Sequence, residues 1–156
     1  MVSSEQRLVA IVGHAGDKFY EPSEDKARWL IREILAPNLF EEVVLVSGGC
    51  HQGGVDIFAE EEAKSLGLDT LIFKPKNLMW STGFKPRNIQ IAKACTEAHC
   101  IVVADYPPGY TTDDKGLRFP TCYHCGMGQK PHIKSGGCWT VKRAGSDGKP
   151  TFWHII

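Results

Sequence analysis

Two glycine pairs, Gly48-Gly49 and Gly53-Gly54, mark the residues best suited to bind an anion. The apolar run 43–46 precedes them and a helical pattern over 55–66 follows. A strand, a glycine-rich loop and a helix start in this order present backbone N–H groups and the positive end of a helix to a phosphate. The loop lacks the Gly-Lys-Ser/Thr of a P-loop and does not fit G-x-G-x-x-G. The glycine-rich loop therefore predicts a phosphate site that belongs to neither of these two motifs. The alternative is two tight turns in an ordinary strand-to-helix connection.

Charged residues lie where they could serve such a site. Asp56 and Glu60 are four residues apart on the helix after the loop, so they share a face and are the candidates for acid–base catalysis. Asp56 could also orient a ribose hydroxyl or hold a divalent cation that accompanies a nucleotide; the alternative is that it stabilises the helix N-terminus. Arg87 and Asn88 stand where a further helix begins, and a guanidinium there can bind phosphate with two hydrogen bonds. The alternative for Arg87 is a structural salt bridge or an ordinary surface charge.

Cysteine and histidine gather in a segment without periodicity, as Cys122-x2-Cys125 followed by His132 and Cys138. Thiolates and an imidazole at this spacing predict a zinc site, and four protein ligands would close it, so the zinc would be structural. His124 is the competing imidazole, but it lies between the first two cysteines, where folding back onto the same ion is awkward. Ordinary free cysteines and a redox dithiol are the alternatives.

Apolar runs alternate with helical patterns along the rest of the chain. Ser23 is the expected N-cap of the first helix, which Pro37-Asn38 ends. This alternation predicts an α/β fold, a Rossmann-like, open and mostly parallel sheet with helices on both faces. Residues 105–135 show neither strand nor helix periodicity, and they are expected to form a long Cys/His-containing loop. The expected strands lie at 8–12, 43–46, 70–73, 100–104 and 151–156, and the expected helices at 23–35, 55–66, 88–94 and 139–144.

Length and composition are those of one ordinary globular domain, residues 1–156, with 105–135 as an insertion and possible zinc knuckle. The 156 residues are 42% hydrophobic and 23% charged, with a net charge of zero, so no basic field favours nucleic acid. No apolar stretch approaches the roughly 20 residues of a membrane span. The N-terminus does not resemble a signal peptide, and six cysteines then indicate reduced thiols or metal ligands in the cytoplasm. The sequence leaves open whether the chain forms a homo-oligomer.

With these motifs in order, the chain resembles the SLOG superfamily, the Rossmann-like group that includes YspA/YpsA-type proteins, the DprA Rossmann domain and the LOG phosphoribohydrolases. The resemblance rests on Ser47-Gly48-Gly49 through Ala59-Glu60, on Arg87-Asn88, and on Ser135-Gly136-Gly137 with Thr140. It implies a nucleotide or nucleotide-derived ligand over the carboxyl ends of the strands. The contacts it implies come from glycine-rich loops and two helix starts: Gly13, Ser47, Gly48, Gly49, Arg87, Asn88, Gly136, Gly137 and Thr140.

One departure from that family bears on catalysis. The LOG enzymes carry a catalytic glutamate at the end of P-G-G-x-G-T-x-x-E, and Arg143 stands at the matching position here. A cation cannot replace a carboxylate at an oxocarbenium-like centre. We therefore expect a nucleotide-binding or sensing module. The alternatives are a hydrolase of a nucleotide's N-glycosidic or phosphate bond, and a zinc-stapled module that contacts nucleic acid or protein.

Overall fold

Five strands form a single all-parallel sheet in the computed structural model, which describes residues 5–36, 41–110, 122–125 and 129–156. Their order across the sheet is β3-β2-β1-β4-β5. The predicted α/β, Rossmann-like class is confirmed. The strands are β1 (Glu5–Gly13), β2 (Glu41–Ser47), β3 (Asp69–Ile72), β4 (Glu97–Val102) and β5 (Thr151–Ile155).

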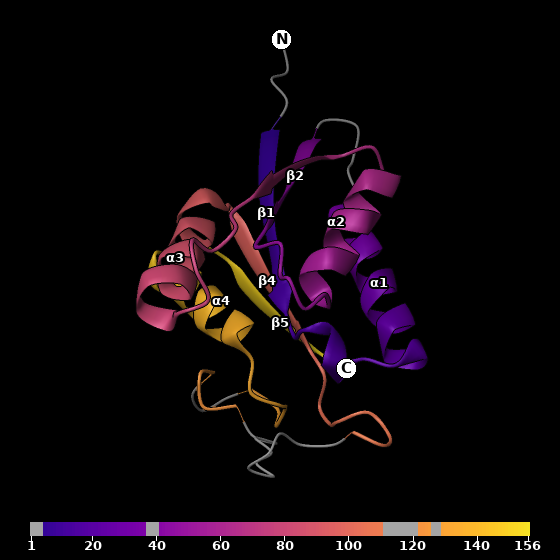
Figure 1. The fold of residues 1–156 in the computed structure, drawn as a ribbon. Coiled ribbons are helices and arrows are strands. Elements are labelled where there is room, and N and C mark those ends of the chain that lie inside the picture. Colours follow the sequence, from indigo (N-terminus) through magenta and orange to yellow (C-terminus); the bar gives the residue numbers. More distant parts are fainter. Residues whose placement is uncertain (1–4, 37–40, 111–121, 126–128) are drawn as a thin grey trace.

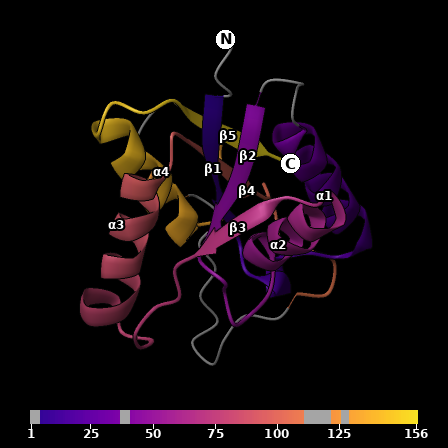
Figure 2. The same cartoon turned by 90° about the horizontal axis from the view of Figure 1, so that it is seen from above.

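Helices cover both faces of the sheet (Figures 1 and 2). On one face Ala27 and Ile31 of α1, with Val55 and Ala59 of α2, bury the side of β1 that carries Ile11. The other face packs against α3 and α4, so alternate residues of each central strand enter different cores. The helices are α1 (Glu21–Leu35), α2 (Val55–Ser65), α3 (Lys85–Ala94) and α4 (Gly136–Ser146).

The first helix begins earlier than its sequence predicts. Tyr20 is the N-cap of α1, and Ser23 lies inside the first turn, where its Oγ accepts the Tyr20 N–H at 3.1 Å. Pro22 fits the first turn because its missing N–H would have no helical partner there. The expected end of this helix, at residues 37–38, lies outside the described residues. The second helix ends at Ser65 with Leu66 as its C-cap, and the predicted stop residue Gly67 follows with a φ of +72°.

The strand order reverses beside β1, and this positions the site. The chain moves outward from β1 to β2 and β3, then crosses back through α3 to place β4 on the other side of β1. Connections leaving β1 and β4 therefore run in opposite directions and open a crevice at the carboxyl ends of the strands. Described parts of the 105–135 insertion lie at this same end, below the sheet in Figure 1. Within the described residues, no helix has the length and apolar character needed to cross a membrane.

Candidate functional site

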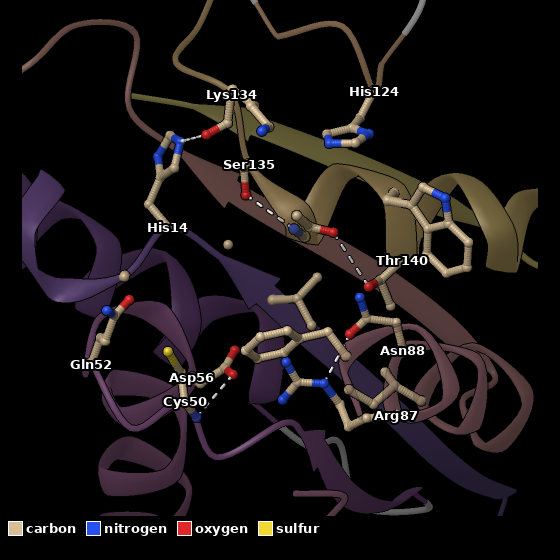
Figure 3. Close-up of a pocket in the computed structure, with 18 of the residues that line it drawn as sticks. His14, Cys50, Gln52, Asp56, Arg87, Asn88, His124, Lys134, Ser135 and Thr140 are labelled. Carbon is tan, nitrogen blue, oxygen red and sulfur yellow. Dashed lines mark hydrogen bonds between the residues drawn. The ribbon is translucent and has the colours of Figure 1, made fainter. Parts of the chain in front are cut away.

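A cavity of about 940 Å³ lies at the carboxyl end of β1, among the loops and helix starts at that edge of the sheet (Figure 3). Its volume lies within the range of roughly 300–1,000 Å³ that is usual for small-molecule sites. Its walls come from the end of β1 and the loop after it, the loop between β2 and α2, the starts of α2 and α3, the insertion and the start of α4. The predicted ligand-binding residues that line it are Gly13, Asp56, Arg87, Asn88, Gly136, Gly137 and Thr140.

The N-terminus of α4 points into this cavity. Ser135 is its N-cap, and the Ser135 Oγ accepts the Gly137 N–H at 3.1 Å. Gly137 lies against the end of β1, because a Cβ there would stand 2.8 Å from the backbone nitrogen of Gly13. Gly136 instead faces open space, with no atom within 4 Å of the position of a Cβ. The positive end of the helix dipole is therefore accessible from the cavity. Lys134 and Lys18 belong to the same walls, and the Lys18 ammonium group is paired with the Asp17 carboxylate at 2.8 Å.

Aromatic side chains form a second part of the wall. Trp80 and Phe84 belong to a single π-helical turn, η2 (Trp80–Phe84), that precedes α3. Trp139 comes from the first turns of α4 and meets Trp80 edge to face, with ring centroids 5.2 Å apart. Trp80 remains 44% exposed although it is large and apolar. A flat apolar ring of a ligand could pack on these side chains.

Arg87 is held at the centre of the site by neutral partners. Its Nη1 donates to the carbonyl of Gly48 at 2.7 Å, and its Nε donates to Oδ1 of Asn88 at 2.9 Å. A Cβ on Gly48 would overlap the guanidinium in this position, so a side chain there would displace Arg87. Both of these hydrogen-bond partners are neutral, and among the described residues no carboxylate forms an ion pair with Arg87, although Asp56 attracts it electrostatically.

Asp56 faces the same space from the first turn of α2. Its Oδ2 accepts the backbone N–H of Cys50 at 3.2 Å, and the residue is only 8% exposed. Burial raises the pKa of Asp56 to about 6, against the opposing influences of Arg87 and the Cys50 amide. The carboxyl group can therefore gain or lose a proton near neutral pH. Glu60, the second predicted acid, lines neither this cavity nor the smaller one beside it; its carboxylate accepts the Ser47 hydroxyl at 3.2 Å.

The glycine-rich loop after β2 directs several of its N–H groups into the protein. The Gly49 N–H bonds to Ser47 Oγ at 3.4 Å, and the Gly53 N–H bonds to the Cys50 carbonyl at 3.2 Å. A Cβ on Gly54, whose φ is +83°, would overlap the carbonyl of His14. The predicted residues of this loop that do not line the main cavity are Ser47, Gly48, Gly49, Gly53 and Gly54, of which Gly49 and Gly53 line a smaller cavity beside it.

His14 ties three parts of the site together, a role that the sequence did not reveal. Its Nδ1 accepts the Val103 N–H at 3.1 Å, and its Nε2 lies 2.9 Å from the Ile133 carbonyl and 3.2 Å from that of Lys134. These contacts require a neutral ring with the proton on Nε2. Burial lowers the pKa of His14 to about 4. The histidine thus joins the ends of β1 and β4 to the residues that lead into α4.

The insertion brings Cys122, Cys125, His132 and Cys138 together into a cluster that could hold a metal ion, with all four ligand atoms within 4.8 Å of one another. Nε2 of His132 lies 3.1 Å from the Cys125 sulfur and 3.4 Å from that of Cys138, and the sulfurs of Cys122 and Cys125 are 3.9 Å apart. Around a tetrahedral ion, two thiolates lie about 3.8 Å apart, and a thiolate and an imidazole nitrogen about 3.6 Å. The cluster fits such an ion.

Neighbouring groups orient the cluster for metal binding. His132 Nδ1 lies 2.6 Å from the carbonyl of Lys130, which fixes the proton on Nδ1 and turns the Nε2 lone pair toward the thiols. Burial raises the pKa of the Cys122 thiol, but hydrogen bonds from the backbone of Ser135 and His124 and from neighbouring thiols outweigh burial and lower it. The structure places His132 in the cluster. His124 lies in the cavity wall instead.

The cluster and the cavity share their supporting segments. Tyr123 and His124, which lie between the first two cysteines, line the cavity. Cys138 belongs to the first turn of α4, directly after Gly136 and Gly137. A metal in the cluster would therefore fix one wall of the cavity and the helix N-terminus that points into it.

Several cavity residues were not predicted as part of the site. Lys134 precedes the second Ser-Gly-Gly, and its position beside that motif was the available signal. Gln52 lies between the two glycine pairs of the first loop, so that loop was its signal, whereas Lys18 follows β1 and only the fold brings it to the cavity. The unpredicted residues include Lys18, Gln52, Tyr123, His124, Lys134 and Trp139. Comparison of the chain with known protein families, curated proteins and solved structures finds no match.

Proposed function

We propose that the protein binds a nucleotide or a nucleotide derivative in the 940 Å³ cavity, as a binding or sensing module. The observation that carries this proposal is the N-terminus of α4, which points into a crevice that also holds Lys18 and Lys134. Helix N-termini with nearby cations favour phosphate. The location agrees with the general rule for open α/β sheets, which bind ligands where the strand order reverses.

The parts of a nucleotide match different walls of the cavity. The phosphate lies at Gly136 and Lys134, where the helix dipole and a cation coincide. The base packs against Trp80 and Trp139. Asp56 accepts a hydrogen bond from a ribose hydroxyl or holds a divalent cation that accompanies the phosphate.

The metal is zinc and its role is structural. Three thiolates and one imidazole are typical zinc ligands, and a site with four protein ligands leaves no open position for substrate. Zinc holds the described part of the insertion against α4, and thereby holds the wall formed by Tyr123 and His124.

The chain is a distant member of the SLOG superfamily. This part of the proposal is supported by the second Ser-Gly-Gly motif at the cavity and by the position of Arg87 and Asn88 beside it. Arg143, which stands in place of the LOG glutamate, does not line the cavity and lies 3.8 Å from Asp147 in an ion pair. A route through that glutamate is therefore not proposed for this chain.

Native mass spectrometry of freshly purified protein tests the proposal. The expected spectrum contains the chain with one zinc ion and with a small molecule whose mass, after denaturation, is that of a nucleotide. Added ribonucleoside 5′-monophosphates should form a one-to-one complex if the natural ligand has been lost. A spectrum without a nucleotide complex at any added concentration would contradict the proposal.

A second candidate function is favoured by one observation, the pKa of about 6 for Asp56 in the cavity wall. A carboxyl group that titrates near the working pH can act as a general acid or base, and the reaction would be hydrolysis of the N-glycosidic or phosphate bond of the bound nucleotide. Incubation with nucleoside mono-, di- and triphosphates, followed by chromatography, should show no free base or released phosphate if the protein is a binding module. Product that forms with the wild type and disappears with Asp56→Asn would establish the hydrolase instead.

A further inference from the structure

A second cavity of about 500 Å³ is lined in part by Arg87, and none of its described lining residues comes from α4. Cys50, Phe84 and Arg87 line both cavities, so the two adjoin at these residues. The main cavity alone is at the upper end of the usual size range for a small ligand. The volume of the second cavity is therefore not needed to hold a ligand of ordinary size, and its lining residues indicate which additional group it could hold.

The charge of the second cavity is one-sided. Lys74 and Arg87 line it, together with His51, and none of its described lining residues is an aspartate or a glutamate. Burial raises the pKa of Glu60, and attraction to Lys74 only partly opposes that rise; the Glu60 carboxylate lies outside the cavity wall. Asp56 likewise attracts Arg87, but it lines the main cavity and not this one. The charged side chains that line the second cavity, Lys74 and Arg87, are therefore both cations.

The first glycine pair makes room for both cations. A Cβ on Gly48 would overlap the guanidinium of Arg87. A Cβ on Gly49 would lie 3.3 Å from Cε of Lys74, so the lysine stem passes across that glycine. The absence of two side chains thus lets two positively charged groups lie against the loop.

We propose that the second cavity binds a second anionic group of the ligand that occupies the main cavity. This inference rests on the proposed function. The ligand is then a nucleotide with two separated phosphate groups, one at the N-terminus of α4 and one at Arg87 and Lys74. The second group is either a phosphate on the ribose of the same nucleoside or the terminal phosphate of a polyphosphate chain.

Calorimetric titration separates these two sources. The probes are the four ribonucleoside 5′-monophosphates, the corresponding 3′,5′-bisphosphates and the corresponding 5′-triphosphates, all without added divalent metal. For the base that binds, the bisphosphate or the triphosphate should bind about tenfold or more tightly than the monophosphate, the gain expected for a charge-assisted hydrogen bond. The tighter of the two identifies the source of the second phosphate.

Two matched lysine variants test whether Lys74 is responsible for the affinity gained from the second phosphate. Lys74→Ala should remove most of the tenfold advantage and leave the monophosphate affinity within twofold of the wild type. Lys76→Ala removes the same charge from the same loop, outside both cavities, and should leave the advantage intact. An advantage that survives Lys74→Ala, or no advantage in the wild type, would overturn the inference while monophosphate binding still supports the proposed function. If none of the probes binds, the proposed function fails, and this inference fails with it.

Discussion

The motif Ser-Gly-Gly occurs at two places near the site, and its backbone groups have different partners in each. Ser47-Gly48-Gly49 ends β2, and its polar groups bond within the protein or support the side chains of Arg87 and Lys74. Ser135-Gly136-Gly137 begins α4, with Ser135 as N-cap and Gly136 facing the open cavity. A glycine motif therefore does not by itself define an anion site. The direction of its N–H groups and the identity of its neighbours do.

The two loops also differ in what holds them. The first is fixed by local hydrogen bonds and by close contact with the backbone of residues 14–15. The second depends on groups distant in sequence: the ring of His14 and the cluster formed by Cys122, Cys125, His132 and Cys138. Perturbations of these supports should therefore affect the two loops separately.

Loss of the metal should have the largest effect, and only on the second loop. Cys122→Ser should lower zinc content well below one equivalent and lower the free energy of unfolding by several kcal/mol, roughly 10 °C in Tm, because metal binding contributes directly to folding. Hydrogen exchange should rise at the start of α4 and stay unchanged at residues 47–54. Cys95→Ala, which removes a buried thiol outside the cluster, is the control. Full zinc content in Cys122→Ser, or six titratable thiols in the folded wild type, would show that the cysteines are free.

Lowering the pH should remove the stabilisation that His14 gives to the loop at 135–137. The pKa of His14 is about 4 in the folded protein, against 6.5 ordinarily, so below pH 6.5 the unfolded chain binds a proton that the folded chain does not. The stabilisation is complete above pH 6.5 and falls by about 3 kcal/mol as the pH drops to 4. Denaturant unfolding across this range should show a smaller loss for His14→Gln than for the wild type. His51→Gln, at an exposed histidine, should behave as the wild type; equal slopes in all three proteins would exclude this role.

Adjacent glycines in the first loop should differ in their tolerance of a side chain. Gly54→Ala places a Cβ against the His14 carbonyl and should cost about 2 kcal/mol or more in the free energy of unfolding. Gly53 has a similar positive φ of +74° but no atom within 4 Å of a Cβ, so Gly53→Ala should cost only about 1 kcal/mol of backbone strain. Chemical denaturation measures both. Equal costs would mean that the loop is not held by contact with residue 14.

The sequence predicted the fold better than it predicted the side chains that hold the loops of the site in place. Apolar runs and helical periodicity led to the parallel α/β sheet, and the Cys122-x2-Cys125 spacing led to the Cys/His cluster that could hold a metal, because each signal lies within a short segment. The role of His14 was not predictable in this way, since its partners are the backbone at Val103, Ile133 and Lys134, which only the folded sheet brings close. The start of α1 at Glu21 was missed because Ser23 reaches back to the Tyr20 N–H instead of acting as the N-cap.

Titration of Gly136→Asp and of the wild type with ribonucleoside 5′-monophosphates tests the central claim most directly. The new carboxylate would stand at the first position of α4, where it complements the helix dipole, so Tm should stay equal or rise slightly. The same carboxylate repels a phosphate at that helix end, so the account predicts one-to-one binding by the wild type and at least a tenfold loss in the variant. Equal affinity in the folded variant, or no binding by the zinc-loaded wild type, would contradict the account.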